Sequence, residues 1–393
     1  MNKVILAFLV TIFFSTVAVA QVSVTKGDLN LEIGAVMSSY LNFRHLKPTE
    51  TNRSENKDRF RLRDARLVMK GEIGKNYEFK LQADFSNIGA TASDPEAPTL
   101  YDANVTYKGL KAVNVIVGYG LLPYSRTSLT GFSKSAYWQR SDAFRGDLFT
   151  RRDVGITLQK SMWQDRIRAY VGVYTGVGEL FYQGDNDPSG AFEYVGRLEA
   201  SYPKRYKDVD NDDDISDKPT VCIGGSVRYT KRNLPVGTTF ITGQGGAYGL
   251  KAIDGERTGM GADAAFYYKG ISAQFETQTL TGKPQNDIDP FLRGLPKDAT
   301  LGKFKFGGWT TQLNYFNKSI KTIFSVRYSQ MDLNDLLVGN SEQFSAAVAY
   351  QLSGYKSMIK AQYFNIQKEE SNDLQRYKEQ FRIGWQFALG SSD

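Results

Sequence analysis

The alternation of apolar and polar residues is clearest near the end of the chain. From position 380 to 389 every second residue is apolar, and polar residues or glycine stand between. The apolar set is Phe381, Ile383, Trp385, Phe387 and Leu389. Successive side chains of a β-strand point to opposite faces, so this period of two predicts a strand with one apolar and one polar face. Its length matches the roughly 9–11 residues with which a tilted strand crosses a bilayer.

The same period recurs along the chain after the first twenty residues. It predicts strands near 28–43, 59–73, 77–86, 99–108, 112–119, 153–161, 166–175, 193–202, 219–230, 259–269, 271–280, 306–316, 319–330, 342–352, 356–365 and 376–389. The fold class predicted from these segments is all-β, a transmembrane antiparallel β-barrel of 16 strands.

The connections between these strands alternate in length. The short turns are 74–76, 109–111, 162–165, 270, 317–318 and 353–355. The long loops are 44–58, 87–98, 120–152, 176–192, 231–258, 281–305, 331–341 and 366–375. Outer-membrane barrels have short periplasmic turns and long external loops, whereas a soluble sandwich or propeller has no reason to sort its connections in this way.

Two segments depart from the regular pattern. Between Arg59 and Glu72 the apolar face changes sides near Asp64, which predicts a β-bulge, because charges would otherwise face lipid. The linker 203–218 is long and acidic where a short turn is expected. Its spacing fails the EF-hand pattern, so we expect a solvated turn, with Asp208, Asp210 and Asp212 as a weak calcium candidate and no other metal site.

The first twenty residues resemble a secretory signal. Lys3 precedes an apolar stretch, and the segment ends in Ala18-Val19-Ala20. We therefore predict a cleaved signal peptide at 1–20 and an outer-membrane barrel domain at 21–393, located in the outer membrane of a Gram-negative bacterium.

Composition excludes several classes of protein. The mean hydropathy of −0.40, with no long apolar run after Gln21, excludes a helical membrane protein. A single cysteine, Cys222, excludes an intramolecular disulfide framework. One histidine, His45, expected in the first external loop, gives little support to a metal centre or a catalytic triad. We predict no enzyme activity, no cofactor and no nucleic-acid partner.

Four motifs in the amino-terminal third resemble one family. They are Arg61-Leu62-Arg63-Asp64-Ala65-Arg66-Leu67, Tyr77-Glu78-Phe79-Lys80-Leu81-Gln82-Ala83-Asp84-Phe85, Asp102-Ala103-Asn104-Val105-Thr106-Tyr107, and Val113-Asn114-Val115 followed by Gly118 and Pro123. In residues, order and spacing they resemble the phosphate-selective porin O and P family. The resemblance implies a 16-stranded porin, a homotrimer, and a third external loop folded into the lumen.

The resemblance also implies roles for particular positions. Arg63 falls on the arginine of the family's Phe/Leu-Arg-x-Ala-x-Leu motif, and Arg140 falls where a basic residue closes the third-loop region. Ser128 and Ser133 stand where phosphate-specific members carry lysines. The match therefore supports a porin more strongly than it supports strict phosphate selectivity.

A barrel of sixteen strands leaves a wide aqueous channel, and the third external loop is the segment expected to narrow it. Basic residues concentrate in that loop. Residues 126–152 contain six of them against Asp142 and Asp147. With Arg63, the predicted anion path at the constriction is Arg63, Arg126, Lys134, Arg140, Arg145, Arg151 and Arg152. The lumen wall would extend it with Lys80, Arg168, Arg197, Arg228, Arg327, Lys360 and Arg382, offset in part by Glu78, Glu199 and Glu276. Cationic groups lower the barrier for an anion, and arginine suits phosphate or carboxylate oxygens.

Three functions remain open at this point. The first is a porin for small hydrophilic solutes that prefers anions such as phosphate or pyrophosphate, and the net charge of +7 agrees with it only mildly. The second is a general diffusion porin whose charges pair with acids and only shape the lumen. The third is a structural barrel, plugged by its third loop, that serves as a partner subunit. In each case the expected partners are the lipid bilayer, lipopolysaccharide and two further copies of the chain.

Overall fold

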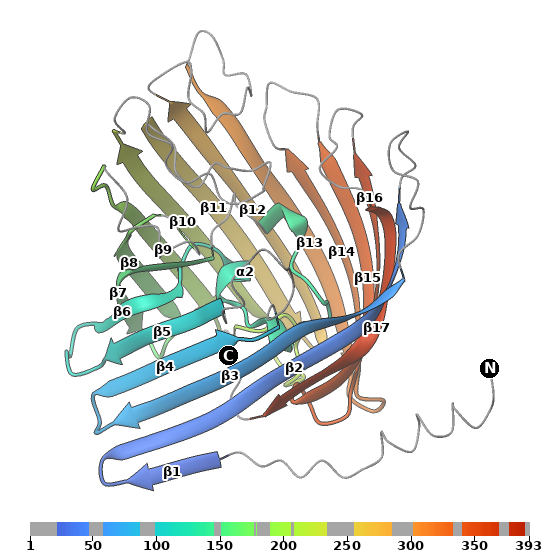
Figure 1. Cartoon of the computed structure of the whole chain (residues 1–393), viewed down its shortest axis with the longest axis horizontal. Coiled ribbons are helices and arrows are strands. Elements are labelled where there is room, and N and C mark those ends of the chain that lie inside the picture. Colours follow the sequence, from blue (N-terminus) through green and yellow to red (C-terminus); the bar gives the residue numbers. More distant parts are fainter. Residues whose placement is uncertain are drawn as a thin grey trace.

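A ring of antiparallel strands forms the body of the molecule (Figure 1). The computed structural model describes residues 22–46, 58–86, 99–144, 151–176, 178, 189–205, 208–233, 255–284, 302–332, 340–368 and 377–389. The predicted signal, residues 1–20, lies outside this part of the chain and stays a prediction. Among the described residues no helix is long and apolar enough to span a membrane.

Sixteen strands form the ring, as the sequence predicts. They are β2 (Leu29–Leu46), β3 (Arg59–Ile73), β4 (Tyr77–Asp84), β5 (Thr99–Tyr107), β6 (Asn114–Leu121), β7 (Arg152–Met162), β8 (Ile167–Tyr174), β9 (Glu193–Tyr202), β10 (Thr220–Arg232), β11 (Gly255–Tyr268), β12 (Ile271–Pro284), β13 (Phe304–Asn317), β14 (Thr322–Asp332), β15 (Ser341–Gln351), β16 (Ser357–Lys368) and β17 (Tyr377–Leu389). His45 lies in β2, so its expected place in the following loop is wrong.

The first and last strands of the ring pair and close it. β17 runs antiparallel to β2, from Tyr377 opposite Leu46 to Leu389 opposite Ala35. Beyond Ala35 the same edge of β2 pairs with a short strand that the sequence pattern did not predict, β1 (Val22–Lys26), in which Val22 lies opposite Ile33. β1 therefore continues the edge that β17 leaves uncovered.

Side chains alternate between the two faces of the wall. On β9, Tyr194 and Leu198 are more than half exposed on the outside, whereas Arg197 and Glu199 are buried inside. β17 has the same arrangement, since Phe381 and Ile383 face outward and Arg382 faces inward. In a soluble protein the apolar residues would face inward instead. An apolar outer band is what lipid requires, and a polar lumen is what water requires.

The predicted bulge lies in β3, next to Asp64. Ser38 of β2 is opposite Asp64, but Ser39 is opposite Leu62, so Arg63 is the extra residue. Phe60, before the bulge, is 81% exposed, and beyond it Leu67 is also exposed while Arg66 is buried. One added residue thus keeps the apolar side chains outside along the whole strand.

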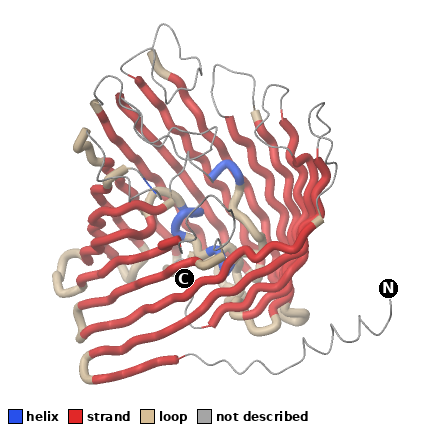
Figure 2. The backbone as a smooth tube through the Cα atoms, viewed as in Figure 1, coloured by secondary structure: helices blue, strands red, loops and turns tan. Residues whose placement is uncertain are grey.

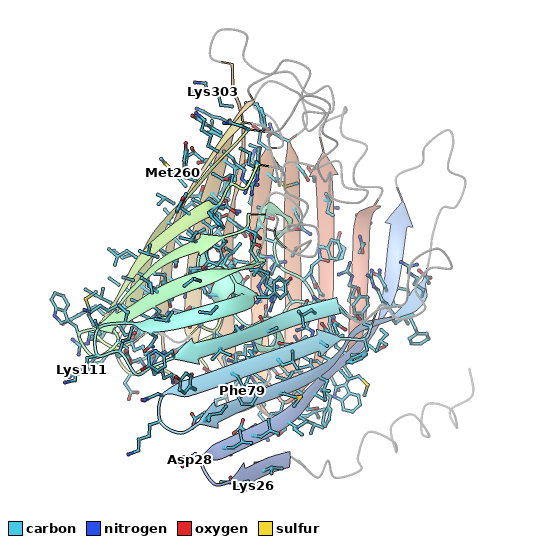
Figure 3. All side chains as sticks on the ribbon, turned by 60° about the vertical axis from the view of Figure 1, so that its left-hand side comes forward. Lys26, Asp28, Phe79, Lys111, Met260 and Lys303 are labelled. Carbon is cyan, nitrogen blue, oxygen red and sulfur yellow. The ribbon has the colours of Figure 1, made fainter. Side chains whose placement is uncertain are left out.

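The strand ends that border the short turns and those that border the long connections lie at opposite ends of the barrel. Figure 3 shows Lys26 at the end of β1, and Asp28 and Lys111 in short turns, toward the lower end, and Lys303, after a long connection, at the upper end. The turn 74–76 is one of the tight ones, and Gly74 adopts a φ of +60° there, a conformation that costs glycine little.

The linker 203–218 is the exception among the turns, and the prediction that it is solvated holds for only part of its described residues: Asp214, Asp217 and Lys218 are exposed. Val209, Asn211, Asp212 and Ser216 are all buried. The Asp212 carboxylate accepts hydrogen bonds from the backbone N–H groups of Ser216 and Gly270, each at 2.9 Å, so it closes the linker's own turn. The linker folds back against the barrel because its polar groups find partners there.

Candidate channel constriction

We call the connection between β6 and β7, residues 122–151, the third loop. Its described residues, 122–144 and 151, lie inside the ring of strands (Figure 2). Its described part contains the one-turn helix α2 (Arg126–Leu129) and the short 3-10 helices η1 (Phe132–Lys134) and η2 (Asp142–Phe144). Ser125 caps α2: its Oγ accepts from Ser128 N at 2.8 Å, and Ser128 Oγ accepts from Ser125 N at 3.2 Å. This capping box fixes the start of the helix.

Two arginines satisfy the other end of α2. Arg140 Nε donates to the carbonyl of Thr127 and its Nη2 to the carbonyl of Thr130, both at 3.0 Å. Arg151 Nε donates to the carbonyl of Ser128 at 2.9 Å. The last carbonyls of a helix have no partners within it and carry partial negative charge, so both predicted constriction arginines also hold the loop's shape.

The first part of the third loop contacts β11 and β12. Arg126 Nη2 donates to Tyr267 Oη at 2.6 Å, and its Nη1 lies 4.0 Å from an oxygen of Asp263. The backbone N–H of Thr127 donates to Glu276 Oε2 at 3.0 Å. These contacts place the predicted anion-path residue Arg126 against the inner wall.

The next part reaches the far wall. Trp138 N donates to Gln362 Oε1 on β16 at 2.8 Å, while Arg327 on β14 donates to the carbonyl of Gln139 at 3.1 Å and Arg382 on β17 donates to its Oε1 at 2.6 Å. In a ring of sixteen strands, β14 is diametrically opposite β6. The third loop therefore crosses the lumen.

Apolar side chains of the third loop also pack against the barrel wall. Tyr137 packs with Phe316, Ile323 and Met358 of the wall, and Tyr124 belongs to a second cluster with Phe304 and Phe306. Burial raises the pKa of Tyr137 to about 12 and also raises the pKa of Tyr124. Both hydroxyls are therefore neutral at physiological pH.

The acidic linker enters the lumen from the opposite end and touches the third loop. Asn211 Nδ2 donates to the carbonyl of Lys134 at 3.3 Å, and Ile215 packs against the cluster that contains Tyr137. The carbonyl of Asp210 accepts from Ser272 Oγ, Gln274 Nε2 and Asn314 Nδ2 at 2.7–2.8 Å. Segments from the two ends of the barrel thus meet inside it.

Most of the predicted wall cations form ion pairs. Arg197 is paired with Asp263 at 2.6 Å and with Glu199, and Arg168 is paired with Glu199 and donates two hydrogen bonds to Asp208. Arg228 forms two hydrogen bonds to Glu193, at 2.6 and 2.7 Å. The hydrogen bonds from Arg168 to Asp208 therefore connect the linker to β8.

A second charged network lies on β3 to β7. Asp102 is paired with Lys80 at 2.8 Å and with Arg152 at 3.0 Å, and the Arg152 guanidinium lies 4.3 Å from the centre of the Tyr101 ring. Arg63, at the bulge, lies 3.7 Å from Asp64. The predicted cations Arg63, Lys80 and Arg152 therefore lie on the same side of the barrel wall.

The remaining predicted cations divide into three groups. Arg327 lies over the Tyr137 ring and Lys360 near the Trp138 ring, so these two contact the third loop by cation–π interactions. Arg382 lies over Tyr40 and Phe364 of the wall and reaches the loop by its hydrogen bond to Gln139. Lys134 stands in η1 and its carbonyl contacts the linker. Arg145 lies outside the described residues.

A cavity remains between the third loop, the linker and β12–β14. Its charged lining is Arg126, Arg140 and Arg327 together with Asp210 and Glu276. It lies where the loop from one end of the barrel and the linker from the other end meet.

The weak calcium candidate does not assemble. Asp208 faces Arg168, Asp210 lines the cavity, and Asp212 closes its own turn. In the part of the chain that the structure describes, no group of three or more acidic, histidine or cysteine side chains is arranged to hold a metal ion.

Sequence reasoning missed the wall acids Asp102, Glu193 and Asp263, and it missed two further contributors to the interior, Arg257 and Asp210. Arg257 donates to Glu193 at 2.9 Å, yet the predicted strand began at residue 259; extending the period of two backward would have found it. Asp210 was read only as a calcium ligand, and the linker carries no periodic signal that predicts an inward path.

Comparisons with known proteins agree with this architecture. The sequence profile described as phosphate-selective porin O and P matches residues 35–389. A search of curated proteins found no match.

Solved structures share the fold at low sequence identity. An anion-selective porin from Comamonas acidovorans has a TM-score of 0.58 at 12% identity, covering 92% of this chain and 99% of that one. The channel DcaP of Acinetobacter baumannii has 0.58 at 11%, covering 93% and 98%. In-vitro folded OmpT of Vibrio cholerae in its trimer form has 0.53 at 11%, covering 92% and 100%. With the family profile spanning nearly the whole barrel, the chain belongs to the phosphate-selective porin O and P family and is a porin of the Gram-negative outer membrane.

Proposed function

We propose that this porin passes small hydrophilic solutes and prefers anions, with phosphate and pyrophosphate the first to test. The observation that supports it is the cavity on the solute path, lined by Arg126, Arg140 and Arg327. Basic side chains outnumber the acidic ones in this lining, and a planar guanidinium suits phosphate or carboxylate oxygens. The porin from Comamonas acidovorans that shares this fold is, by its name, anion-selective.

Reversal potentials in a salt gradient test the preference for anions. We expect the wild type to favour chloride over potassium, and Arg140→Gln to lower the permeability ratio by about two- to fivefold, because a charge at a constriction acts at close range. Glutamine keeps a donor for the carbonyl of Thr127 or Thr130. Arg205→Gln is the matched control, since the Arg205 side chain lies in the linker and is 55% exposed to solvent, unlike the half-buried Arg140. Cation preference in the wild type, or an unchanged ratio in Arg140→Gln, would contradict the proposal.

Two other functions each have an observation in their favour. The pairing of Arg168, Arg197 and Arg228 with carboxylates favours a general diffusion porin. The meeting of the third loop and the linker inside the barrel favours a plugged structural subunit. Adding phosphate to the chloride solution distinguishes an anion-selective porin from a general diffusion porin. Phosphate is expected to reduce the chloride current only in the selective channel. A barrel that shows no conductance in planar bilayers would be the third.

We further infer that the porin is a homotrimer. The family membership and the trimer form of a fold relative support it. We expect the detergent-solubilised protein to have three times the mass of one chain by light scattering, and to migrate as a larger species on gels before heating. A single-chain mass at concentrations where the barrel stays folded would refute the trimer.

A further inference from the structure

The outer surface of the barrel carries a band of aromatic side chains on β12 to β14. The centre of the Trp309 ring lies 6.2 Å from that of Phe275 and 5.4 Å from that of Tyr328. Trp309 and Tyr328 belong to the outward-facing sets of their strands, which include the exposed residues Leu313 and Val326. Tryptophan and tyrosine prefer the boundary between lipid tails and headgroups. The band therefore marks where the hydrocarbon ends on this side of the barrel.

Lysines occupy the outward positions beyond this aromatic band. Lys305 lies four residues before Trp309, toward the external end of β13. Four residues span about 13 Å along a strand, or about 10 Å along the membrane normal at the usual strand tilt. Lys283 is exposed at the same end of β12. Figure 3 shows Lys303, directly before β13, nearer the upper end of the barrel than Met260 of the apolar outer surface.

The register of the strands brings these lysines together. We define the lysine group as Lys231, Lys283, Lys303 and Lys305. Lys305 is opposite Thr281, so it lies diagonally across from Lys283, with about 7–8 Å between positions of this kind. Lys303 lies two residues before Lys305, at the next position of the same face. Lys231, at the external end of β10, is 53% exposed. The group therefore extends from β10 to β13 at one level of the outer surface.

Two acids share this part of the surface. Glu256 on β11 is opposite both Lys231 and Lys283, and its carboxylate lies 3.4 Å from the Lys231 ammonium. Asp332 lies at the external end of β14. Among the described residues, four lysines against two acids leave this surface basic. Like charges on neighbouring strands repel each other, so an anion placed between the lysines is favoured.

The neighbouring strands carry the opposite charge at the same end of the barrel. Beyond the exposed outward residues Phe344 of β15 and Phe381 of β17, the next outward positions are Glu342 and Glu379. Glu379 accepts a hydrogen bond from Asn365 of β16 at 3.2 Å. The lysine group is therefore a local basic surface and does not reflect a general excess of positive charge around the barrel.

We propose that the lysine group binds the phosphate groups of lipopolysaccharide, the phosphorylated lipid of the outer leaflet. Its acyl chains lie against the apolar surface below the aromatic band, which places its phosphorylated sugars at the level of the lysines. The apolar stems of the lysines cover part of the band, and their ammonium groups reach the headgroups. Because the site lies outside the lumen, the inference rests on the outer-membrane location and not on the preference of the channel for anions.

The affinity of the detergent-solubilised porin for fluorescent lipopolysaccharide tests the site. We expect the double variant Lys283→Gln/Lys305→Gln to bind about tenfold more weakly or worse, since one lysine near an anionic lipid surface contributes roughly a factor of five. We expect the wild type to bind dephosphorylated lipopolysaccharide with a loss of similar size. Inorganic phosphate should not displace the lipid, because it has no acyl chains to bury.

The matched control removes two lysines from the other end of the barrel. Lys318 and Lys321 are exposed in the turn between β13 and β14, and Lys318→Gln/Lys321→Gln should leave the affinity unchanged. An equal loss in this control would overturn the proposal, as would unchanged binding by Lys283→Gln/Lys305→Gln. Equal binding of the two lipid forms by the wild type would do so even where a variant folds poorly. Displacement by inorganic phosphate would assign the lysines to the free ion instead. A cation-selective reversal potential would refute the anion preference alone.

Discussion

Replacing residues 203–220 with a two-residue Asn-Gly turn is expected to raise the single-channel conductance about twofold or more, since a sixteen-stranded barrel is wide and the linker narrows it from inside. Tyr202 and Val221 lie directly opposite each other on β9 and β10, which is the geometry that a two-residue hairpin turn needs. Planar-bilayer recording measures the effect.

A matched control separates pore opening from a general effect of shortening a turn. The connection 318–321 joins Asn317 and Thr322, which also lie opposite each other, and its residues are exposed at the barrel end. Asn-Gly in place of 318–321 should leave the conductance unchanged. An unchanged conductance after removal of the linker, with the barrel folded, would show that the linker does not narrow the solute path.

Glu193→Gln is expected to lower the free energy of unfolding by about 3–5 kcal/mol, because removing one member of a buried ion-pair network leaves uncompensated charge in the interior. Glu193 is 1% exposed and accepts hydrogen bonds from Arg228 at 2.6 and 2.7 Å and from Arg257 at 2.9 Å. Urea unfolding of the barrel in lipid vesicles gives the difference.

The control for this substitution is the same chemical change at an exposed pair. Glu256 lies 3.4 Å from Lys231, and the two side chains are 40% and 53% exposed. Glu256→Gln should cost less than about 1 kcal/mol, because water screens such a pair. Similar losses in the two variants would mean that the Glu193 network contributes no more than a surface ion pair.

The wall of the barrel was predictable because its rule is local. Lipid on one side and water on the other require every second residue to change character, and that requirement can be read within ten residues, as on β17. The bulge at Arg63 was predictable for the same reason, since a change of phase over a few residues marks it. Missing β1 has a local cause too, because five residues carry too short a pattern.

The candidate site was predictable in its residue types but not in its arrangement. Arg126, Arg140 and Arg327 were singled out as basic residues of the loop and wall, and the structure brings all three to one cavity. Arg140 and Arg151 also cap α2, a role that depends on the loop folding back on itself. The acidic residues of the linker gave no signal for their positions, because Asp208, Asp210 and Asp212 each face a different group.

The sequence by itself determined the strands, their faces, the family and the outer-membrane location. The resemblance implied a third loop inside the lumen, but only the tertiary structure decided which groups hold that loop and that the linker meets it there. Trp138 and Gln362 are separated by 224 residues, and Asn314 lies 104 residues from Asp210, so neither contact leaves a pattern along the chain. The physical reason is that the wall is specified by solvent, which acts on each residue separately. The constriction is specified by pairs of groups that meet only after the ring has closed.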